Sequence, residues 1–226
     1  MININQFKIE IVTRQNAITS EQFRGAFISY IREQFTPDEQ NKLPMDLAFN
    51  KDKNAKLLNR YAFMQYATRK NTLEIVSIKN SDKIVELWLE KVLKNQNFSI
   101  NGKSVKLTDI QRKTNYWQPQ LSKPQLYKIE NWIPFRSDNL GDETKFDRII
   151  WGNIHRLLTD LEIEFDEKPF IHILEYKRNK RMIKGYDIKW ISYQLILSTN
   201  INLPENLGIG HIVSLGNGKI KKLKLL

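Results

Sequence analysis

The chain has 226 residues and a formal net charge of +11, from 36 Lys and Arg against 25 Asp and Glu. An excess of this size favours a polyanionic partner, such as nucleic acid or an acidic membrane surface, although surplus surface lysine would have the same composition. Cysteine is absent, which excludes disulfides, thiolate zinc sites and a cysteine nucleophile.

The three histidines, His155, His172 and His211, lack the close spacing of metal ligands, so no metal or other cofactor is expected. No apolar run approaches the length of a membrane span, so no membrane partner is expected. The first residues alternate like a strand and do not resemble a signal peptide. We therefore expect a cytoplasmic protein.

The first half of the chain predicts a domain of alternating strands and helices. Residues 2–13 have the period of two of a strand, and residues 19–35 have apolar side chains at helical spacing. Residues 36–59 are polar and predict a long loop, with at most a short helix near Ala55. The next expected elements are strands at 61–68 and 73–78, a helix starting at Ser81 or Asp82, and a strand pair around Asn101-Gly102. This order is that of a ferredoxin-like domain.

A proline-bearing connector after Trp117 predicts a boundary between two domains, residues 1–118 and 119–226. The second domain begins with an expected strand at 126–135 and an amphipathic helix at 146–161. Further strands are expected at 170–176, 186–197 and 212–223. The predicted fold class is thus α+β, with two tandem ferredoxin-like domains. In the second, a short helix or a glycine-rich loop takes the place of the second helix.

That loop carries four of the nine glycines of the chain, as two Gly-x-Gly pairs. They are Gly208, Gly210, Gly216 and Gly218. Glycine suits places where the backbone turns tightly or another molecule comes close. We expect a folded-back loop whose free amides bind an anion, and the lysines that follow, starting with Lys219, favour a phosphate chain. A glycine-rich hairpin at a sheet edge is the alternative.

Residues 176–186 carry five basic side chains and no acidic one. These are Lys177, Arg178, Lys180, Arg181 and Lys184. We expect a hairpin whose cations contact RNA phosphates, which would make the affinity steeply salt dependent. A charged hairpin tip that is merely solvated is the alternative.

Four pieces of the chain match the motifs of one family in order. They are Phe-Arg-Gly-Ala-Phe at 23–27, Arg-Tyr-Ala-Phe-Met-Gln-Tyr at 60–66, Phe-Asp-Arg-Ile-Ile-Trp-Gly-Asn-Ile at 146–154 and Gly-Ile-Gly-His-Ile-Val-Ser-Leu-Gly-Asn-Gly at 208–218. With them the chain resembles the RAMP superfamily of CRISPR-associated proteins, and within it the endoribonucleases that cut the repeat in CRISPR precursor RNA.

The resemblance implies two ferredoxin-like (RRM-like) domains and metal-independent cleavage. In such cleavage the ribose 2′-hydroxyl attacks the adjacent phosphate and leaves a 2′,3′-cyclic phosphate. The implied partners are CRISPR repeat RNA and subunits of a CRISPR effector complex, with the chain a monomer or a homodimer. The signature loop is expected to contact RNA through Gly208, Gly210, His211, Ser214, Gly216, Gly218 and Lys219.

The chain departs from the family at the catalytic loop. Phe49-Asn50-Lys51 stands where the family often has His-Asn-His, so Lys51 and Lys53 become candidates for stabilising the reacting phosphate. Tyr30 is a candidate catalytic tyrosine, with a buried core aromatic as its alternative. Three functions stay open: an active endoribonuclease, a catalytically weak or inactive RNA-binding subunit of a CRISPR effector complex, and an unrelated RNA-binding module.

Overall fold

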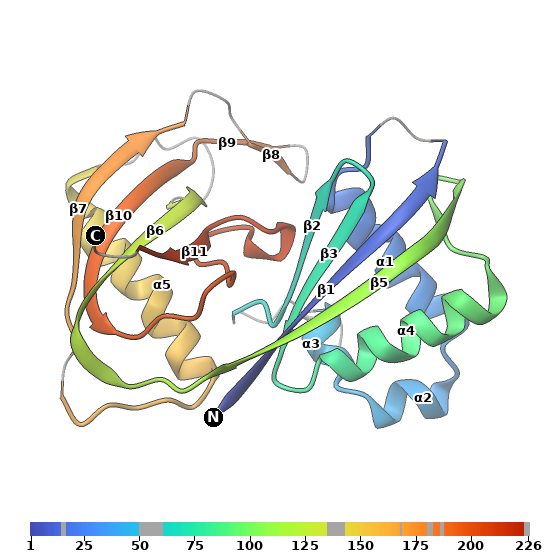
Figure 1. The fold of residues 1–226 in the computed structure, drawn as a ribbon, viewed down its shortest axis with the longest axis horizontal. Helices are drawn as coiled ribbons and strands as arrows, with labels where there is room; N and C mark the ends of the chain where they lie inside the picture. Colours follow the sequence, from blue (N-terminus) through green and yellow to red (C-terminus); the bar gives the residue numbers. More distant parts are fainter. Residues whose placement is uncertain are drawn as a thin grey trace. The chain divides into compact units, whose positions relative to one another are not determined.

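The structure is a computed structural model, and it divides the chain into two compact units, Ile2–Tyr116 and Trp117–Leu226 (Figure 1). It describes residues 1–14, 17–49, 61–134, 143–167, 169–179, 183–185 and 188–223. The backbone of residues 183–185 and 188–189 is described without their side chains.

The N-terminal unit is built on a five-stranded sheet with the order β2-β3-β1-β5-β4. Its strands are β1 (Ile2–Thr13), β2 (Met64–Arg69), β3 (Thr72–Ile78), β4 (Ser99–Ile100) and β5 (Lys103–Trp117). Its helices are α1 (Ser20–Gln34), α2 (Pro37–Lys42), α3 (Met45–Phe49) and α4 (Asp82–Asn95). Helices α1 and α4 lie on the same face of the sheet (Figure 1).

Aromatic side chains join these two helices to the sheet. Phe23 and Phe27 are one turn apart on α1, and both are completely buried. The ring of Phe27 lies 5.0 Å from that of Trp88 on α4 and 5.4 Å from that of Tyr66 on β2, measured between centroids. Tilted aromatic contacts at these distances each add about 0.5–1.5 kcal/mol beyond the burial of their area. The helical spacing expected of residues 19–35 is therefore confirmed.

The loop expected at residues 36–59 contains two short helices, α2 and α3, and this part of the prediction is wrong. Thr36 caps α2: its hydroxyl accepts from the amide of Glu39, and the Glu39 carboxylate accepts from the amide of Thr36. Helices of six and five residues are too short to develop a visible apolar period, so their capping signals were the available evidence. Ala55 lies outside the described residues.

The C-terminal unit is built on a four-stranded sheet with the order β11-β6-β10-β7. Its elements are β6 (Leu121–Trp132), η1 (Glu143–Lys145), α5 (Phe146–Asp160), β7 (Ile171–Arg178), β8 (Ile183–Gly185), β9 (Ile188–Trp190), β10 (Tyr193–Ile201), η2 (Val213–Leu215) and β11 (Lys219–Lys222). The first strand of each unit lies inside its sheet, β1 between β3 and β5 and β6 between β10 and β11, as in a ferredoxin-like domain. The predicted fold class is confirmed, and the glycine-rich segment with η2 replaces the second helix.

Three expected strands differ in their limits. Strand β6 starts at Leu121 and includes Pro124, which is tolerated because β11 pairs with β6 only from Tyr127 to Glu130. The expected strand at 186–197 divides into β9 and β10. The expected strand at 212–223 is shortened to β11, because Ile212 and Gly216 have the left-handed backbone of a turn, with φ of 45° and 77°.

Helix α5 covers one face of this sheet (Figure 1). Phe146 at its start is buried between Trp132 and Tyr193, with ring centroids 5.0 Å and 4.8 Å away. The indole of Trp132 donates to Asn153 Oδ1 at 2.9 Å. The amphipathic helix expected at 146–161 is confirmed. Among the described residues, no helix is both long enough and apolar enough to cross a membrane.

Candidate nucleic-acid interface

The amides of the glycine-rich loop are largely used inside the chain. The amide of Ile209 donates to Gly218 O at 3.0 Å, and that of Gly218 donates to Asn131 O at 3.1 Å. The amide of His211 donates to Ile133 O at 3.0 Å. The expectation of a row of free amides that bind an anion is therefore wrong, because these donors hold the loop onto the end of β6.

The glycines serve this close packing. A Cβ added at Gly218, where φ is +71°, would lie 1.8 Å from Ile209 O. A Cβ added at Gly210, where φ is +111°, would lie 2.8 Å from Cδ1 of Trp132. Gly208 is buried and forms a β-bridge with Lys219. Glycine is needed at Gly210 and Gly218 because the chain approaches itself closely there.

Part of the loop still reaches the surface. His211, Ser214 and Gly216 are half-buried, and the ring of His211 stacks on that of Trp190 at a centroid distance of 6.5 Å. The side chain of Lys219, in contrast, is buried, with 9% of the residue exposed. Lys219 therefore does not offer the open cation that was expected, whereas His211 and Ser214 keep accessible side chains.

A pair of asparagines connects this loop to the basic strand β7. Asn179 follows Arg178, and its Nδ2 donates to Asn131 Oδ1 at 3.1 Å and to Ser192 Oγ at 2.8 Å. Asn131 is also the residue whose carbonyl oxygen accepts from Gly218. The exposed side chains of Lys177 and Arg178 thus lie at the end of β7 that is joined to the loop, and the structure brings these predicted residues together.

The described part of the basic run lies in the expected antiparallel arrangement: β7 pairs with β10 up to Arg178 and Tyr193, and β8 pairs with β9. Lys177 and Arg178 belong to β7, and the hairpin is made by β8 and β9, which pair Lys184 with Lys189. Lys180 and Arg181 lie outside the described residues, as does the side chain of Lys184. Within the described part, the phosphate-binding prediction therefore depends on Lys177 and Arg178.

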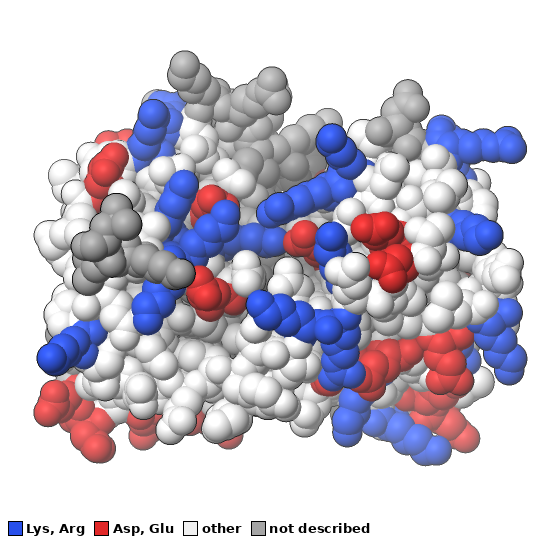
Figure 2. Space-filling model, viewed as in Figure 1, with Lys and Arg blue, Asp and Glu red and all other residues white. Residues whose placement is uncertain are grey.

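The sheet face away from α5 carries Lys177 of β7, whereas Arg178 pairs with Tyr193 on the α5 side. Lys128 of β6 pairs directly with Lys221 of β11, and both side chains therefore project from the same face. Figure 2 shows Lys and Arg side chains on this unit, with acidic side chains set among them. The face is cationic overall but contains Glu130, which lies between the two lysines.

Glu130 is held ionised by its neighbours. The Nζ atom of Lys221 lies 2.9 Å from each Glu130 carboxylate oxygen, and that of Lys128 lies 3.7 Å from Oε1. Burial by itself would raise the pKa of the Glu130 carboxyl, but the hydrogen bond and charge of Lys221, together with Lys128, lower the pKa overall from its usual 4.5.

This shift predicts a pH-dependent contribution to stability. Because the folded pKa of Glu130 lies below its unfolded value, the contribution is present above about pH 4.5 and is lost as the pH falls through the folded pKa. We expect Glu130→Gln to lower the free energy of urea unfolding more at pH 6 than at pH 3. In a Lys221→Met background most of that difference should disappear. An equal effect of Glu130→Gln at both pH values would contradict the assignment.

The predicted catalytic residues do not come together in the described structure. Tyr30 is only 6% exposed, and its hydroxyl donates to Asn97 Oδ1 at 2.9 Å. Burial raises the pKa of its phenol, which disfavours the phenolate. Tyr30 is therefore a core aromatic, and its catalytic assignment does not fit. Lys51 and Lys53 lie outside the described residues, and their role stays a prediction.

Three residues of this interface were missed from the sequence. Trp190 supports His211, and Asn131 and Asn179 join the loop to β7. Of the three, only Asn131 could have been suspected from the local sequence. It has the left-handed backbone, with φ of 54°, and asparagine adopts that conformation more readily than most residues. The other two contacts join positions distant in the chain and leave no local pattern. Among the described residues, no cluster of His, Asp and Glu could hold a metal ion.

No protein-family model and no curated protein sequence matches the chain significantly. Solved structures do match it along its whole length. A crystal structure of Cas6b superposes with a TM-score of 0.67 at 17% identity, covering 98% of this chain and 100% of that one. The chain has the Cas6 fold. The resemblance found in the sequence is thus confirmed at the level of the fold.

Other Cas6 and RAMP structures agree. A Cas6 product complex has a TM-score of 0.64 at 11% identity, covering 97% of this chain and 99% of that one. A RAMP protein described as binding different RNA substrates has a TM-score of 0.54 at 16% identity, covering 97% and 100% of the two chains. At such identities the comparison establishes the shared Cas6 fold.

Proposed function

We propose that the protein binds the repeat of CRISPR precursor RNA and cleaves it as an endoribonuclease. The observation that carries the proposal is the joining of the glycine-rich loop to the basic end of β7 through Asn131 and Asn179. This contact presents Lys177, Arg178 and the half-buried His211 on a unit whose fold occurs in Cas6 structures, one of them a product complex. The formal net charge of +11 further favours a phosphate backbone as the ligand.

The chemistry that we propose needs no metal ion. The ribose 2′-hydroxyl attacks the adjacent phosphorus, the bond to the 5′-oxygen breaks, and the products carry a 2′,3′-cyclic phosphate and a 5′-hydroxyl. Such a reaction requires proton transfer and positive charge near the phosphate. Lys51 and Lys53 are the proposed cations. In this assignment the lysines stabilise the charge of the pentacoordinate phosphate.

The proposal is tested with the full chain and its cognate repeat RNA in EDTA. We expect cleavage that is lost when the cut site carries a 2′-deoxyribose. We expect Lys51→Ala to slow cleavage far more than it weakens binding, as measured by gel shift on the deoxy substrate. Equal losses of cleavage and binding would remove Lys51 from the reaction, and cleavage of the deoxy RNA would rule out attack by the 2′-hydroxyl.

A second function is favoured by one sequence feature. No histidine occurs in the first 154 residues, so the first unit holds no imidazole base. The same interface would then serve a non-catalytic RNA-binding subunit of a CRISPR effector complex. Tight repeat binding without any product in the EDTA assay supports this function. Equal competition by unrelated RNA of the same length would instead indicate a general RNA-binding module.

A further inference from the structure

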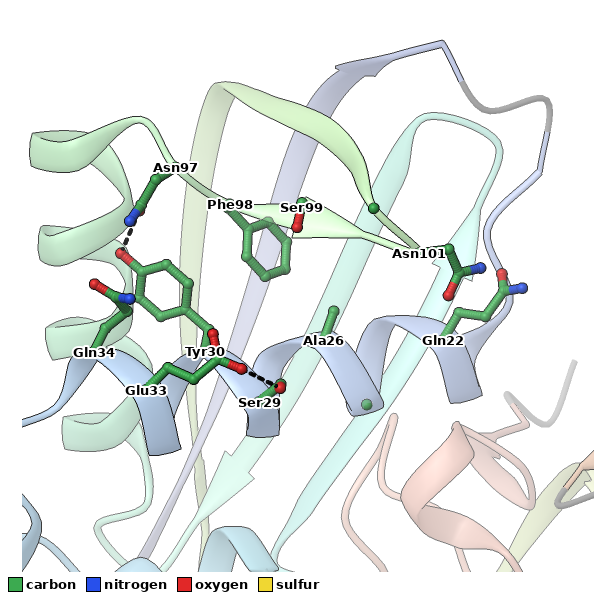
Figure 3. Close-up of a pocket in the computed structure, with 12 residues that line it drawn as sticks. Gln22, Ala26, Ser29, Tyr30, Glu33, Gln34, Asn97, Phe98, Ser99 and Asn101 are labelled. Carbon is green, nitrogen blue, oxygen red and sulfur yellow. Dashed lines mark hydrogen bonds between the residues drawn. The ribbon is translucent and has the colours of Figure 1, made fainter.

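The N-terminal unit has a polar hollow of about 390 Å³ between helix α1 and the segment that joins α4 to β5 (Figure 3). Its volume falls in the range of about 300–1,000 Å³ that is usual for small-ligand sites. The α1 wall includes Gln22, Gly25 and Glu33, and the opposite wall includes Asn97 and Asn101. None of these residues belongs to the nucleic-acid interface on the C-terminal unit.

Gly25 is one of the residues that line the hollow. It is exposed in the middle of α1, and a Cβ added there would meet no atom within 4 Å. Packing therefore does not require glycine, although glycine in a helix interior costs about 0.5–1 kcal/mol relative to alanine. Because Gly25 lines the hollow, a large side chain at this position would occupy part of it. The missing side chain leaves room for a flat group against the helix backbone.

The hydrogen-bonding groups of the hollow have fixed roles. Oε1 of Gln22 accepts from the Thr19 amide at 3.0 Å, which leaves its Nε2 as a donor. Oδ1 of Asn97 accepts from the Tyr30 hydroxyl, which leaves its Nδ2 as a donor. Tyr30 is thus a positioning residue for Asn97. Both walls of the hollow therefore supply amide donors.

Glu33 supplies the complementary acceptor. Among the described residues that line the hollow it is the one charged side chain, and its Oε1 accepts from Ser29 Oγ at 2.7 Å (Figure 3). A carboxylate without a cation beside it repels phosphate and favours a ligand with two adjacent N–H groups. Guanine offers these groups at N1 and N2, and its O6 and N7 accept from amide donors.

The geometry points to a binding pocket for an unpaired guanine base, with Glu33 on its N1–H and N2–H edge and Asn97 as a donor to the base. This inference depends on the proposed function, because an RNA ligand would carry the base to the hollow. Adenine and cytosine each offer a single amino group to the carboxylate, so they fit less well. A peptide amine also suits a carboxylate, but it has no use for the amide donors.

Equilibrium dialysis of the full chain against radiolabelled guanosine, inosine and adenosine tests the pocket. We expect guanosine to bind at least about tenfold more tightly than inosine, which lacks the N2 amino group and so loses one hydrogen bond to a charged acceptor. We expect Glu33→Gln to weaken guanosine about tenfold. Equal binding of the three nucleosides, or no retention of guanosine, would overturn the inference.

Gly25→Leu should abolish guanosine binding by filling the hollow. Leucine is a better helix former than glycine, so this variant should fold at least as well as the parent. Gly152→Leu is the matched control, because Gly152 is also an exposed glycine inside a helix with no atom within 4 Å of an added Cβ. It should leave guanosine binding unchanged. Retention of guanosine by the Gly25→Leu variant would overturn the assignment.

Two further measurements separate the possible failures. Glycinamide, tested in the same dialysis, would indicate a peptide amine site if it is retained while guanosine is not, and that result overturns the inference. Repeat-RNA binding is measured on the same samples by gel shift. If guanosine is retained but repeat RNA is not bound, the proposed function is contradicted and the guanine pocket is supported. If repeat RNA is bound but guanosine is not retained, the guanine pocket is contradicted and the proposed function is supported.

Discussion

Replacing Gly218 by alanine is expected to lower the free energy of unfolding by about 2–5 kcal/mol. Two costs add. The backbone of Gly218 has a φ of +71°, which disfavours any residue with a Cβ, and the new Cβ would lie 1.8 Å from Ile209 O. That neighbour is a backbone atom held by the hydrogen bond from the Ile209 amide to Gly218 O, so it cannot move aside without breaking the contact.

The same substitution should also damage the nucleic-acid interface. The Gly218 amide donates to Asn131 O, and Asn131 is the residue that binds Asn179 beside Arg178. A shift of the loop at Gly218 therefore disturbs the connection to β7. We expect the urea midpoint to fall and repeat-RNA affinity to fall with it, when the variant is assayed by gel shift at a temperature where it remains folded.

Gly152→Ala is the same chemical change, but we expect it to raise the free energy of unfolding. Gly152 lies inside α5, and its added Cβ meets nothing within 4 Å, so alanine should stabilise the protein by about 0.5–1 kcal/mol. Urea unfolding of the three proteins at one temperature measures both effects. A Gly218→Ala variant as stable as the parent would contradict the packing role assigned to this glycine.

The regular elements of both units were predictable from the sequence, and the reason is their length. Helices α1 and α5 have 15 residues each, which is enough for an apolar stripe to repeat several times. Helices α2 and α3 offer one turn or little more, so only the cap at Thr36 and the proline after it could have indicated α2. Among the helices, those long enough for the apolar spacing to repeat were the ones predicted from the sequence.

The glycine-rich loop shows what periodicity and composition do not determine. Two Gly-x-Gly pairs correctly indicated unusual backbone and close approach, but the sequence did not say which atoms approach. The closest neighbours of Gly210 and Gly218 are Trp132 and Ile209, on the chain itself. Likewise, Asn131 and Asn179 are 48 positions apart, so their hydrogen bond depends on the pairing of β6, β10 and β7, which no local pattern specifies.

Replacing Lys177 and Arg178 together by glutamine is expected to weaken repeat-RNA binding about tenfold at 0.15 M salt. Both side chains are exposed, and neither forms an ion pair with a described residue, so their charges are available to a ligand. Exposed ionic contacts contribute roughly 0.7 kcal/mol each, and two of them amount to about a factor of ten. Stability should change little, because both positions lie on the surface.

The salt dependence of binding distinguishes lost phosphate contacts from a general loss of charge. Each phosphate contact contributes about 0.7–0.9 to the slope of log affinity against log salt, so the double variant should lose roughly 1.4–1.8 from that slope. The matched control is Lys83→Gln with Lys94→Gln, two exposed cations of α4 on the other unit. Each pair lowers the formal net charge from +11 by two, to +9. If the control pair reduced the slope as much as the β7 pair, RNA would be held by the overall charge of the protein, and the interface at the end of β7 would lose its support.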